Sequence, residues 1–315
     1  MSVEIPSYGR AAAQFSELTH VGLSKSSLQE LVKAYGGQLV ARQAEEAQAT
    51  MEMPSKEGGE VRRALPQPPS EAMNISMDGA MVHIRGEGWK EVKAVAVSAL
   101  GHLIDRGTGK VTTLLSEHSY RAGLWDASEF CQQQWAEACR RGVEKAGYLS
   151  SVNDGAAWIW NIVRMCYGNC VEIIDWWHVV EKLWLIGQHR FGAETEEATA
   201  WVSAQKQLLI EGSLRQLVRN IRLIYPRGNA LPDSVRNATH YLFHNRRRMR
   251  YRLFRQAGYP IGSGTVESAC KLVVQQRLKQ SGMRWSRDGA QAMLALRATL
   301  LSQPSHPSLS HIGLV

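Results

Sequence analysis

The sequence predicts an α/β protein in which a mixed sheet is flanked by helices, and two observations carry that prediction. From residue 74 onward, apolar and polar residues alternate with the period of two that is typical of a half-buried strand. Segments of helical period then alternate with short apolar runs up to residue 188. The 315 residues are 44% apolar, which permits a sizeable core in one large or two smaller domains.

Three strands open the predicted sheet, and the later elements follow in the order helix, strand, helix, strand, helix. The strands are predicted at 74–85, 90–100, 110–115, 148–153 and 171–174, with turns at 86–88 and 105–107. The helices between and after the last strands are predicted at 127–146, 156–167 and 176–188. Residues 73–190 therefore form the first part of the predicted core.

A helical segment over residues 1–53 precedes the sheet. One helix covers 8–18, and a second begins after Ser24 and ends at Gly36-Gly37, with a polar helix continuing over 38–53. The first two helices form either a helix-turn-helix or an ordinary helical hairpin. Residues 54–72 are rich in Pro and Gly and are predicted to be a linker.

The α/β rhythm is interrupted at residues 191–258, which are predicted to be an all-α insertion with helices at 193–211, 213–225 and 233–256. Residues 259–302 then return to the core as two helices, and residues 303–315 form a loose tail. Pro260, Gly262 and Gly264 make a tight entry to a basic helix predicted over 268–280.

Glu267 lies on the edge of the apolar stripe of this basic helix. The stripe recurs at helical spacing and should face the core: Val266, Cys270, Val273, Val274 and Leu278. Lys271, Gln275 and Lys279 run beside it. A carboxylate directed inward next to a basic row suits a divalent metal held against a phosphate backbone. The simpler alternative is that Glu267 interacts favourably with the helix dipole.

Positive charge is concentrated in the C-terminal third of the chain. The net charge is +8, and the span from Arg246 to Arg287 holds eleven Lys or Arg with Glu267 as its single acid. Such clustering favours an anionic partner. The candidate nucleic-acid contacts are Arg246, Arg247, Arg248, Arg250, Lys271, Arg277, Lys279, Arg284 and Trp285. A solvated helix face for the arginines and core packing for Trp285 are the alternatives.

Three aspartates lie in or directly after predicted strands. Asp78 falls inside the first strand, Asp154 follows the strand at 148–153, and Asp175 follows the strand at 171–174. A buried carboxylate is costly unless a cation or hydrogen bonds satisfy it, and Mg²⁺ prefers carboxylate oxygens. Asp154 and Asp175 could instead cap the helices that follow them. For His178, a hydrogen bond with Asp175 that braces the strand–helix junction is the preferred interpretation.

Taken together, these residues resemble the DDE-type transposases of bacterial insertion sequences, in the branch related to Mutator-like elements. The similarity spans about residues 70–302. Asp78, Asp154 and Glu267 match the family's three acids, and Asp175-Trp-Trp-His178 matches its (Cys or Asp)-x-x-His signature. The most specific stretches are Ile261-Gly-Ser-Gly-Thr-Val-Glu-Ser-Ala-Cys, Gln276-Arg-Leu-Lys and Ser281-Gly-Met-Arg-Trp285.

The resemblance implies an RNase H-like core and metal-dependent DNA transposition. Asp78, Asp154 and Glu267 would hold two Mg²⁺ ions, with Mn²⁺ as a substitute, and Asp175 and His178 would support them. The partners implied are double-stranded DNA, at the element's ends and at the target, and further copies of the chain in a synaptic complex. A truncated remnant that binds DNA without transposing and a non-transposase RNase H-like nuclease are the alternatives.

The chain departs from the family before the core. Family members usually carry a longer region with a zinc-finger-like module there, whereas the first 70 or so residues here contain no Cys. The resemblance therefore does not extend to recognition of the element's ends. Five cysteines, an odd number, and no apolar run of membrane-spanning length predict reduced thiols in a cytoplasmic protein that does not contact a membrane. The resemblance implies that this protein is associated with the nucleoid.

Overall fold

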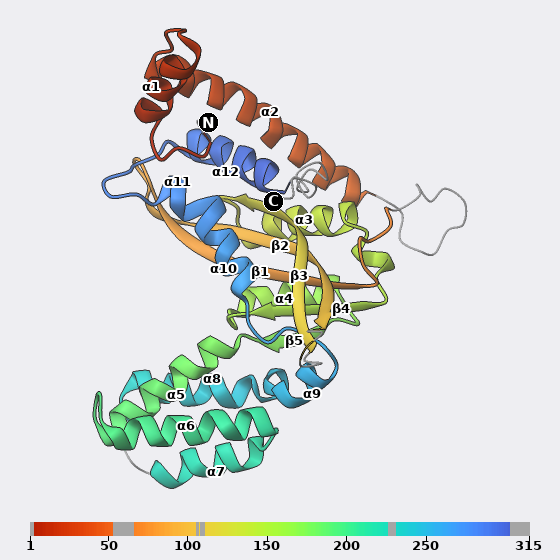
Figure 1. Cartoon of the computed structure of the whole chain (residues 1–315), viewed down its shortest axis with the longest axis vertical. Coiled ribbons are helices and arrows are strands. Elements are labelled where there is room, and N and C mark those ends of the chain that lie inside the picture. The colour runs from red at the N-terminus through yellow and green to blue at the C-terminus, as the bar shows by residue number, and fades with distance from the viewer. Residues whose placement is uncertain (1–2, 53–65, 105–106, 108–110, 226–230, 303–315) are drawn as a thin grey trace. The chain divides into compact units, whose positions relative to one another are not determined.

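The structure is a computed structural model, and it describes residues 3–52, 66–104, 107, 111–225 and 231–302. Five strands form one mixed sheet in the order β3-β2-β1-β4-β5, and helices flank it, so the predicted α/β class is confirmed (Figure 1). The strands are β1 (Ala72–Ile84), β2 (Gly88–Ile104), β3 (Val111–Gly123), β4 (Tyr148–Asn153) and β5 (Val171–Ile174).

The chain divides into two compact units, which are described one at a time. Unit 1 comprises the described residues of Met1–Gly101, Leu115–Leu149 and Gly264–Val315, and unit 2 comprises those of His102–Leu114 and Ser150–Ser263. The helices of unit 1 are α1 (Tyr8–Thr19), α2 (Lys25–Met51), α3 (Ala127–Arg140), α10 (Gly264–Ala269), α11 (Gln276–Leu278) and α12 (Arg287–Leu301). Short helical segments add η1 (Val143–Lys145) and η3 (Cys270–Gln275).

Within unit 1, β1 and β2 form an antiparallel hairpin in which Asp78 is opposite Ala94. Side chains two residues apart share one face of a strand. On the face of Asp78, the buried core residues of the hairpin are Ala80, Val82, Ile84, Val92, Ala94 and Ala96. They belong to one cluster with the predicted apolar stripe of the basic helix, Val266, Cys270, Val273, Val274 and Leu278. The inward orientation of that stripe is therefore confirmed.

The basic helix itself differs from the prediction in two respects. It begins at Gly264, where α10 starts, four residues earlier than the predicted start at Ser268. Its middle, η3, is a π-helix, and only three residues of α11 follow it. Carbonyl oxygens of η3 accept side-chain hydrogen bonds from Arg297 of α12, which gives the irregular turns a partner outside the helix.

The helix predicted to end at Gly36-Gly37 continues without a break through α2 to Met51. α2 packs against α12 and α3. A Cβ atom on Gly36 would lie 2.6 Å from the Cβ of Ala292, so glycine is needed there for the close approach of α2 to α12. Gly36 thus reflects helix packing, and the glycine pair does not mark a helix end.

Three other elements have bounds that differ from the predicted ones. β3 runs to Gly123, well beyond the predicted 110–115. α3 ends at Arg140, and Gly142 follows with φ +69, a conformation that favours glycine. The predicted helix 233–256 is broken into α8 (Asp233–His244), η2 (Arg246–Met249) and α9 (Tyr251–Gln256). Met249 and Tyr251 are buried at this break, where η2 packs against β5.

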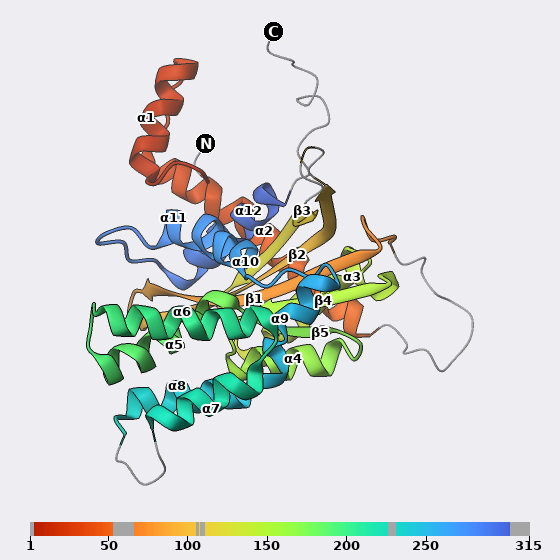
Figure 2. The same ribbon diagram turned by 60° about the horizontal axis from the view of Figure 1, so that its bottom comes forward.

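Unit 2 combines β4 and β5 with a group of helices (Figure 2). Its other helices are α4 (Ala157–Cys166), α5 (Trp176–Phe191), α6 (Glu196–Glu211) and α7 (Leu214–Ile224). α5 packs against α6 and α8, and α6 packs against α7 and α9. β4 and β5 are parallel, with Asn153 opposite Ile174. The helices predicted at 193–211 and 213–225 correspond to α6 and α7.

Two further expectations can be compared with the described residues. No helix among them combines the length and hydropathy that a membrane crossing requires. The five cysteines are free thiols. Residues 54–65 of the linker predicted at 54–72, residues 105 and 106 of the turn predicted at 105–107, and the whole tail (303–315) lie outside the described residues.

We predict that Gly36→Val destabilises the protein by about 1–3 kcal/mol, because the new side chain would overlap α12. Gly37→Ala is the matched control. Gly37 is exposed in the same helix, and an added methyl group there would meet nothing within 4 Å, so this variant should gain about 0.5–1 kcal/mol. Urea unfolding followed by circular dichroism measures both. A neutral Gly36→Val would contradict the tight contact between α2 and α12.

Candidate active site

Asp78 lies where one face of β1 changes from polar to apolar. Asn74 and Ser76 precede it on the same face, and both are buried. The amide of Asn74 donates a hydrogen bond of 3.0 Å to the Ser76 hydroxyl. Ala80, the next residue on that face, begins the apolar cluster. The half-buried Asp78 carboxylate therefore borders the core of unit 1, and its Oδ1 accepts a hydrogen bond of 2.7 Å from the amide of Gly79.

Glu267 is carried by α10, which packs directly on β1. Its neighbour Val266 lies in the same core cluster as Ala80 and is 1% exposed, whereas Glu267 is exposed. α10 therefore brings Glu267 to the edge of the sheet face on which Asp78 lies. Unit 1 thus supplies two of the three predicted acids from elements that pack against each other.

Asp154 and Asp175 occupy equivalent positions in unit 2. Each directly follows the carboxyl end of one of two neighbouring parallel strands, because Asn153 of β4 pairs with Ile174 of β5. The carboxyl edge of parallel strands is a common location for ligand sites. Asp154 is half-buried, and its Oδ1 accepts a hydrogen bond of 2.9 Å from the amide of Ala156.

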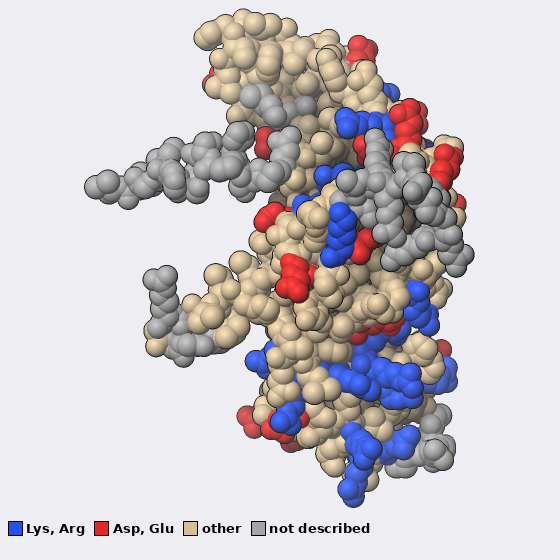
Figure 3. Space-filling model, turned by 90° about the vertical axis from the view of Figure 1, so that its right-hand side faces the viewer, with Lys and Arg blue, Asp and Glu red and all other residues tan. Residues whose placement is uncertain are grey.

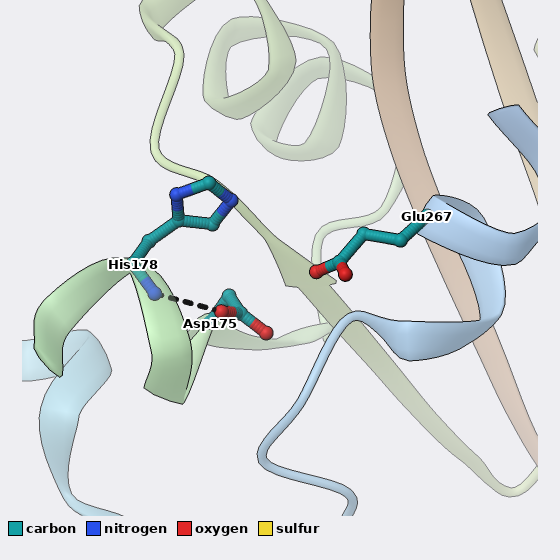
Figure 4. Close-up of side chains that lie close together, drawn as sticks. All are labelled: Asp175, His178 and Glu267. Atoms are coloured by element: carbon teal, nitrogen blue, oxygen red, sulfur yellow. Dashed lines mark hydrogen bonds between the residues drawn. The ribbon is translucent and has the colours of Figure 1, made fainter. Parts of the chain in front are cut away.

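Asp175 is fully buried, and backbone amides satisfy its two carboxylate oxygens. Oδ1 accepts from the amide of His178 at 2.9 Å, which caps α5, and Oδ2 accepts from the amide of Ser263 at 2.5 Å. The predicted hydrogen bond between Asp175 and His178 is present, although the donor is the backbone of His178 and not its ring (Figure 4). Asp175 therefore fixes both the start of α5 and the loop that ends at Ser263.

The ring of His178 remains available to a ligand. It is partly exposed, and Nδ1 lies 3.4 Å from a carboxylate oxygen of Glu181. A carboxylate oxygen of Asp175 and a ring nitrogen of His178 lie within 4.8 Å of each other. Figure 4 also draws Glu267, from α10 of unit 1. Asp175 and His178 thus offer a carboxylate oxygen and an imidazole nitrogen, and both are ligand atoms that could bind a metal ion.

Tyr241 of α8 is a site residue that the sequence did not indicate. Its hydroxyl donates a hydrogen bond of 2.6 Å to the backbone carbonyl of Asp154. Burial, and then the charges of Asp154, Asp175 and Glu181, raise the pKa of this hydroxyl above its ordinary value, so it remains a donor at neutral pH. A Cβ atom on Gly155 would lie 2.8 Å from the Tyr241 ring. No periodicity connects Tyr241 to the aspartates, because it comes from a helix far along the chain.

The predicted nucleic-acid contacts divide into exposed and buried groups. The exposed ones are Lys271, Lys279 and Arg284 in unit 1, and Arg246, Arg247 and Arg250 in unit 2. Figure 3 shows Lys and Arg side chains gathered over the helices of unit 2, in the lower part of the view.

Arg277 and Trp285 are buried and have structural contacts, so the prediction that they touch DNA is corrected. Arg277 is 1% exposed, and its guanidinium carbon lies 4.5 Å from the ring centre of Tyr8 and 5.0 Å from that of Trp285. Trp285 is 8% exposed, and its backbone pairs with the end of β1 at His83 and Arg85. The core of unit 1 takes up both side chains, as the alternative of core packing for Trp285 anticipated.

Arg248 is also held by protein groups. Its guanidinium forms an ion pair with Glu172 at 2.5 Å and lies 4.2 Å from the ring centre of Trp160. Its side chain is 12% exposed. These contacts fasten η2 to β5 and α4 within unit 2, which leaves Arg248 little surface for a phosphate.

Comparison with known proteins does not assign a family to this chain. No family model matches the sequence, and no curated protein matches it at a significant level.

We predict that Asp175→Ala lowers the free energy of unfolding by about 2–4 kcal/mol, because it removes a helix cap and leaves the buried amide of Ser263 without an acceptor. Asp126→Ala is the matched control. Asp126 caps α3 with one hydrogen bond at an exposed position, and its loss should cost about 1 kcal/mol. Urea denaturation compares the two, and equal losses would mean that the Ser263 contact contributes nothing.

Proposed function

We propose that this chain is a DDE-type DNA transposase that cleaves the ends of a mobile element and joins them to target DNA. In this proposal the fold is RNase H-like, residues 191–258 are a helical insertion, and Asp78, Asp154 and Glu267 hold Mg²⁺. The observation that carries it is the arrangement of unit 1. A carboxylate inside a strand, at the border of the core, shares a sheet face with the helix that carries Glu267.

The residues present fit divalent metal ions. Asp78, Asp154 and Glu267 offer hard oxygen donors, and none of the three is fully buried, so each can reach a hydrated cation. When bound, two Mg²⁺ ions would lower the pKa of an attacking water or 3′-hydroxyl and stabilise charge on the leaving oxygen. The carboxylates would keep those ions in place. Asp175, through its caps on α5 and Ser263, would keep the strand ends rigid.

The reaction is a pair of in-line displacements at phosphorus. Water first attacks a phosphodiester at the element's end, and the bond to the 3′-oxygen breaks and leaves a free 3′-hydroxyl. That hydroxyl then attacks a phosphodiester of the target strand, and the displaced group is the target's own 3′-oxygen. No net oxidation occurs. The exposed Lys271 and Lys279 would hold backbone phosphates beside Glu267.

We predict that Asp78→Asn and Glu267→Gln each reduce cleavage at least about a hundredfold while leaving DNA binding intact, because each removes a metal ligand. The assay incubates the purified full-length chain with duplexes copied from the DNA that flanks its gene, with Mg²⁺ or with EDTA. Glu91→Gln is the matched control, because Glu91 lies on β2 on the opposite face of the sheet from Asp78.

The products of that assay separate the alternatives. Joined products with a supercoiled plasmid are expected for a transposase, whereas cuts without joining would indicate a nuclease. Binding without any cleavage by the wild-type chain would indicate a DNA-binding remnant. Normal cutting by Asp78→Asn would show that the metal site has been assigned wrongly.

We predict that Lys271→Ala combined with Lys279→Ala weakens duplex binding equally for unrelated sequences. The slope of log K against log salt should become shallower by about 0.9 for each phosphate that the variant no longer binds. Lys145→Ala, at an exposed lysine of η1, serves as the control. Fluorescence anisotropy between 50 and 200 mM salt, about the range over which such interactions weaken, measures the slope. An unchanged slope would remove these lysines from the DNA interface.

A further inference from the structure

Unit 2 contains a pocket whose described lining residues include neither Asp154 nor Asp175. The pocket has a volume of about 620 Å³, and all its lining residues belong to unit 2. They come from the start of β3, the end of α6, α9 and the segment 259–261. This volume is within the range of small-molecule sites, about 300–1,000 Å³.

One wall of the pocket is cationic. Arg252 and Arg255 line it from α9, where residues three apart lie on the same side of a helix. Arg252 is held in place, because its guanidinium donates to the carbonyl of Glu211 at 3.3 Å and its side chain packs against Gly212. Among the described residues that line the pocket, none is Asp or Glu. The pocket is therefore suited to an anion.

The rest of the lining is largely apolar. Tyr259, Pro260 and Ile261 form one part of it, and Ile210 and Val111 contribute further apolar surface. Hydrogen bonds fix the 259–261 segment at both ends. The amide of Tyr259 donates to Phe254 O at 2.9 Å, and the amide of Trp176 donates to Ile261 O at 2.9 Å. These two hydrogen bonds therefore fix the position of the apolar wall.

We propose that this pocket binds a nucleoside monophosphate, either free or as the 5′-phosphorylated terminal nucleotide of a single strand. Two guanidinium groups match the charge and the oxygen geometry of a phosphate monoester. A tyrosine ring beside proline and isoleucine matches the flat face of a base. Two cations, with no carboxylate among the described lining residues, disfavour a metal ion at this position, so the binding needs no Mg²⁺. The inference is independent of the proposed metal site.

The test is calorimetric titration of the full-length chain, in phosphate-free buffer with EDTA, against deoxyadenosine monophosphate, deoxyadenosine and inorganic phosphate. The monophosphate should bind at least about tenfold more tightly than either fragment. Arg252→Ala and Arg255→Ala should each weaken it about tenfold, because a charge-assisted hydrogen bond is lost. Arg219→Ala, at an exposed arginine of α7 outside the pocket, should leave it unchanged.

Further arms identify the source of the ligand and separate this proposal from the transposase proposal. A 5′-phosphorylated tetranucleotide that binds more tightly than the monophosphate would identify a strand end as the ligand, and the reverse order would identify a free nucleotide. Asp78→Asn should bind the monophosphate normally. Equal binding by wild type and Arg255→Ala, equal binding of phosphate and monophosphate, or no binding of any probe would overturn the proposal. Circular dichroism confirms that each variant is folded.

Discussion

The apolar face of the β1–β2 hairpin has to be covered, and much of unit 1 follows from that requirement. Ala80, Val82 and Ile84 would expose a continuous apolar strip if the segment from Gly264 did not lie across it. This face of β1 becomes polar at Asp78, and Ser76 and Asn74 beyond it are buried. The same burial that drives the helix onto the sheet therefore also brings Glu267 to the border at which Asp78 lies.

Two buried arginines keep that covering helix in an irregular form. Arg297 donates to the carbonyls of Leu272 at 3.1 Å and Val273 at 3.0 Å, inside the π-helical segment. Burial, reinforced by the charge of Arg277, lowers the pKa of Arg297 to about 10, so it is still cationic at neutral pH. Arg277 packs between Tyr8 and Trp285. These contacts attach α1 and α12 to the helical segment that follows Glu267. The position of that segment therefore depends on contacts that lie away from the acids.

Local patterns in the sequence predicted the elements well but not the partners of charged residues. β4 and β5 have the predicted bounds, because a short apolar run between two helices is typical of a buried strand. Arg277 was predicted to contact DNA, yet it is buried. Its aromatic partner Tyr8 lies in the first helix, and helical periodicity carries no information about so distant a contact. The clamp between Asp175 and Ser263, 88 residues apart, was invisible for the same reason.

Unit 2 separates its charges, and this separation determines what each part of it can bind. Burial raises the pKa of the Tyr241 hydroxyl most, and the charges of Asp154, Asp175 and Glu181 raise it further, so these three acids lie near one another around the carboxyl ends of β4 and β5. Arg252 and Arg255 line a pocket whose described lining residues include no acid. If acidic and basic side chains lay next to each other here, they would form ion pairs, as Arg248 does with Glu172. Because they are kept apart, the strand ends favour a cation and the pocket favours an anion.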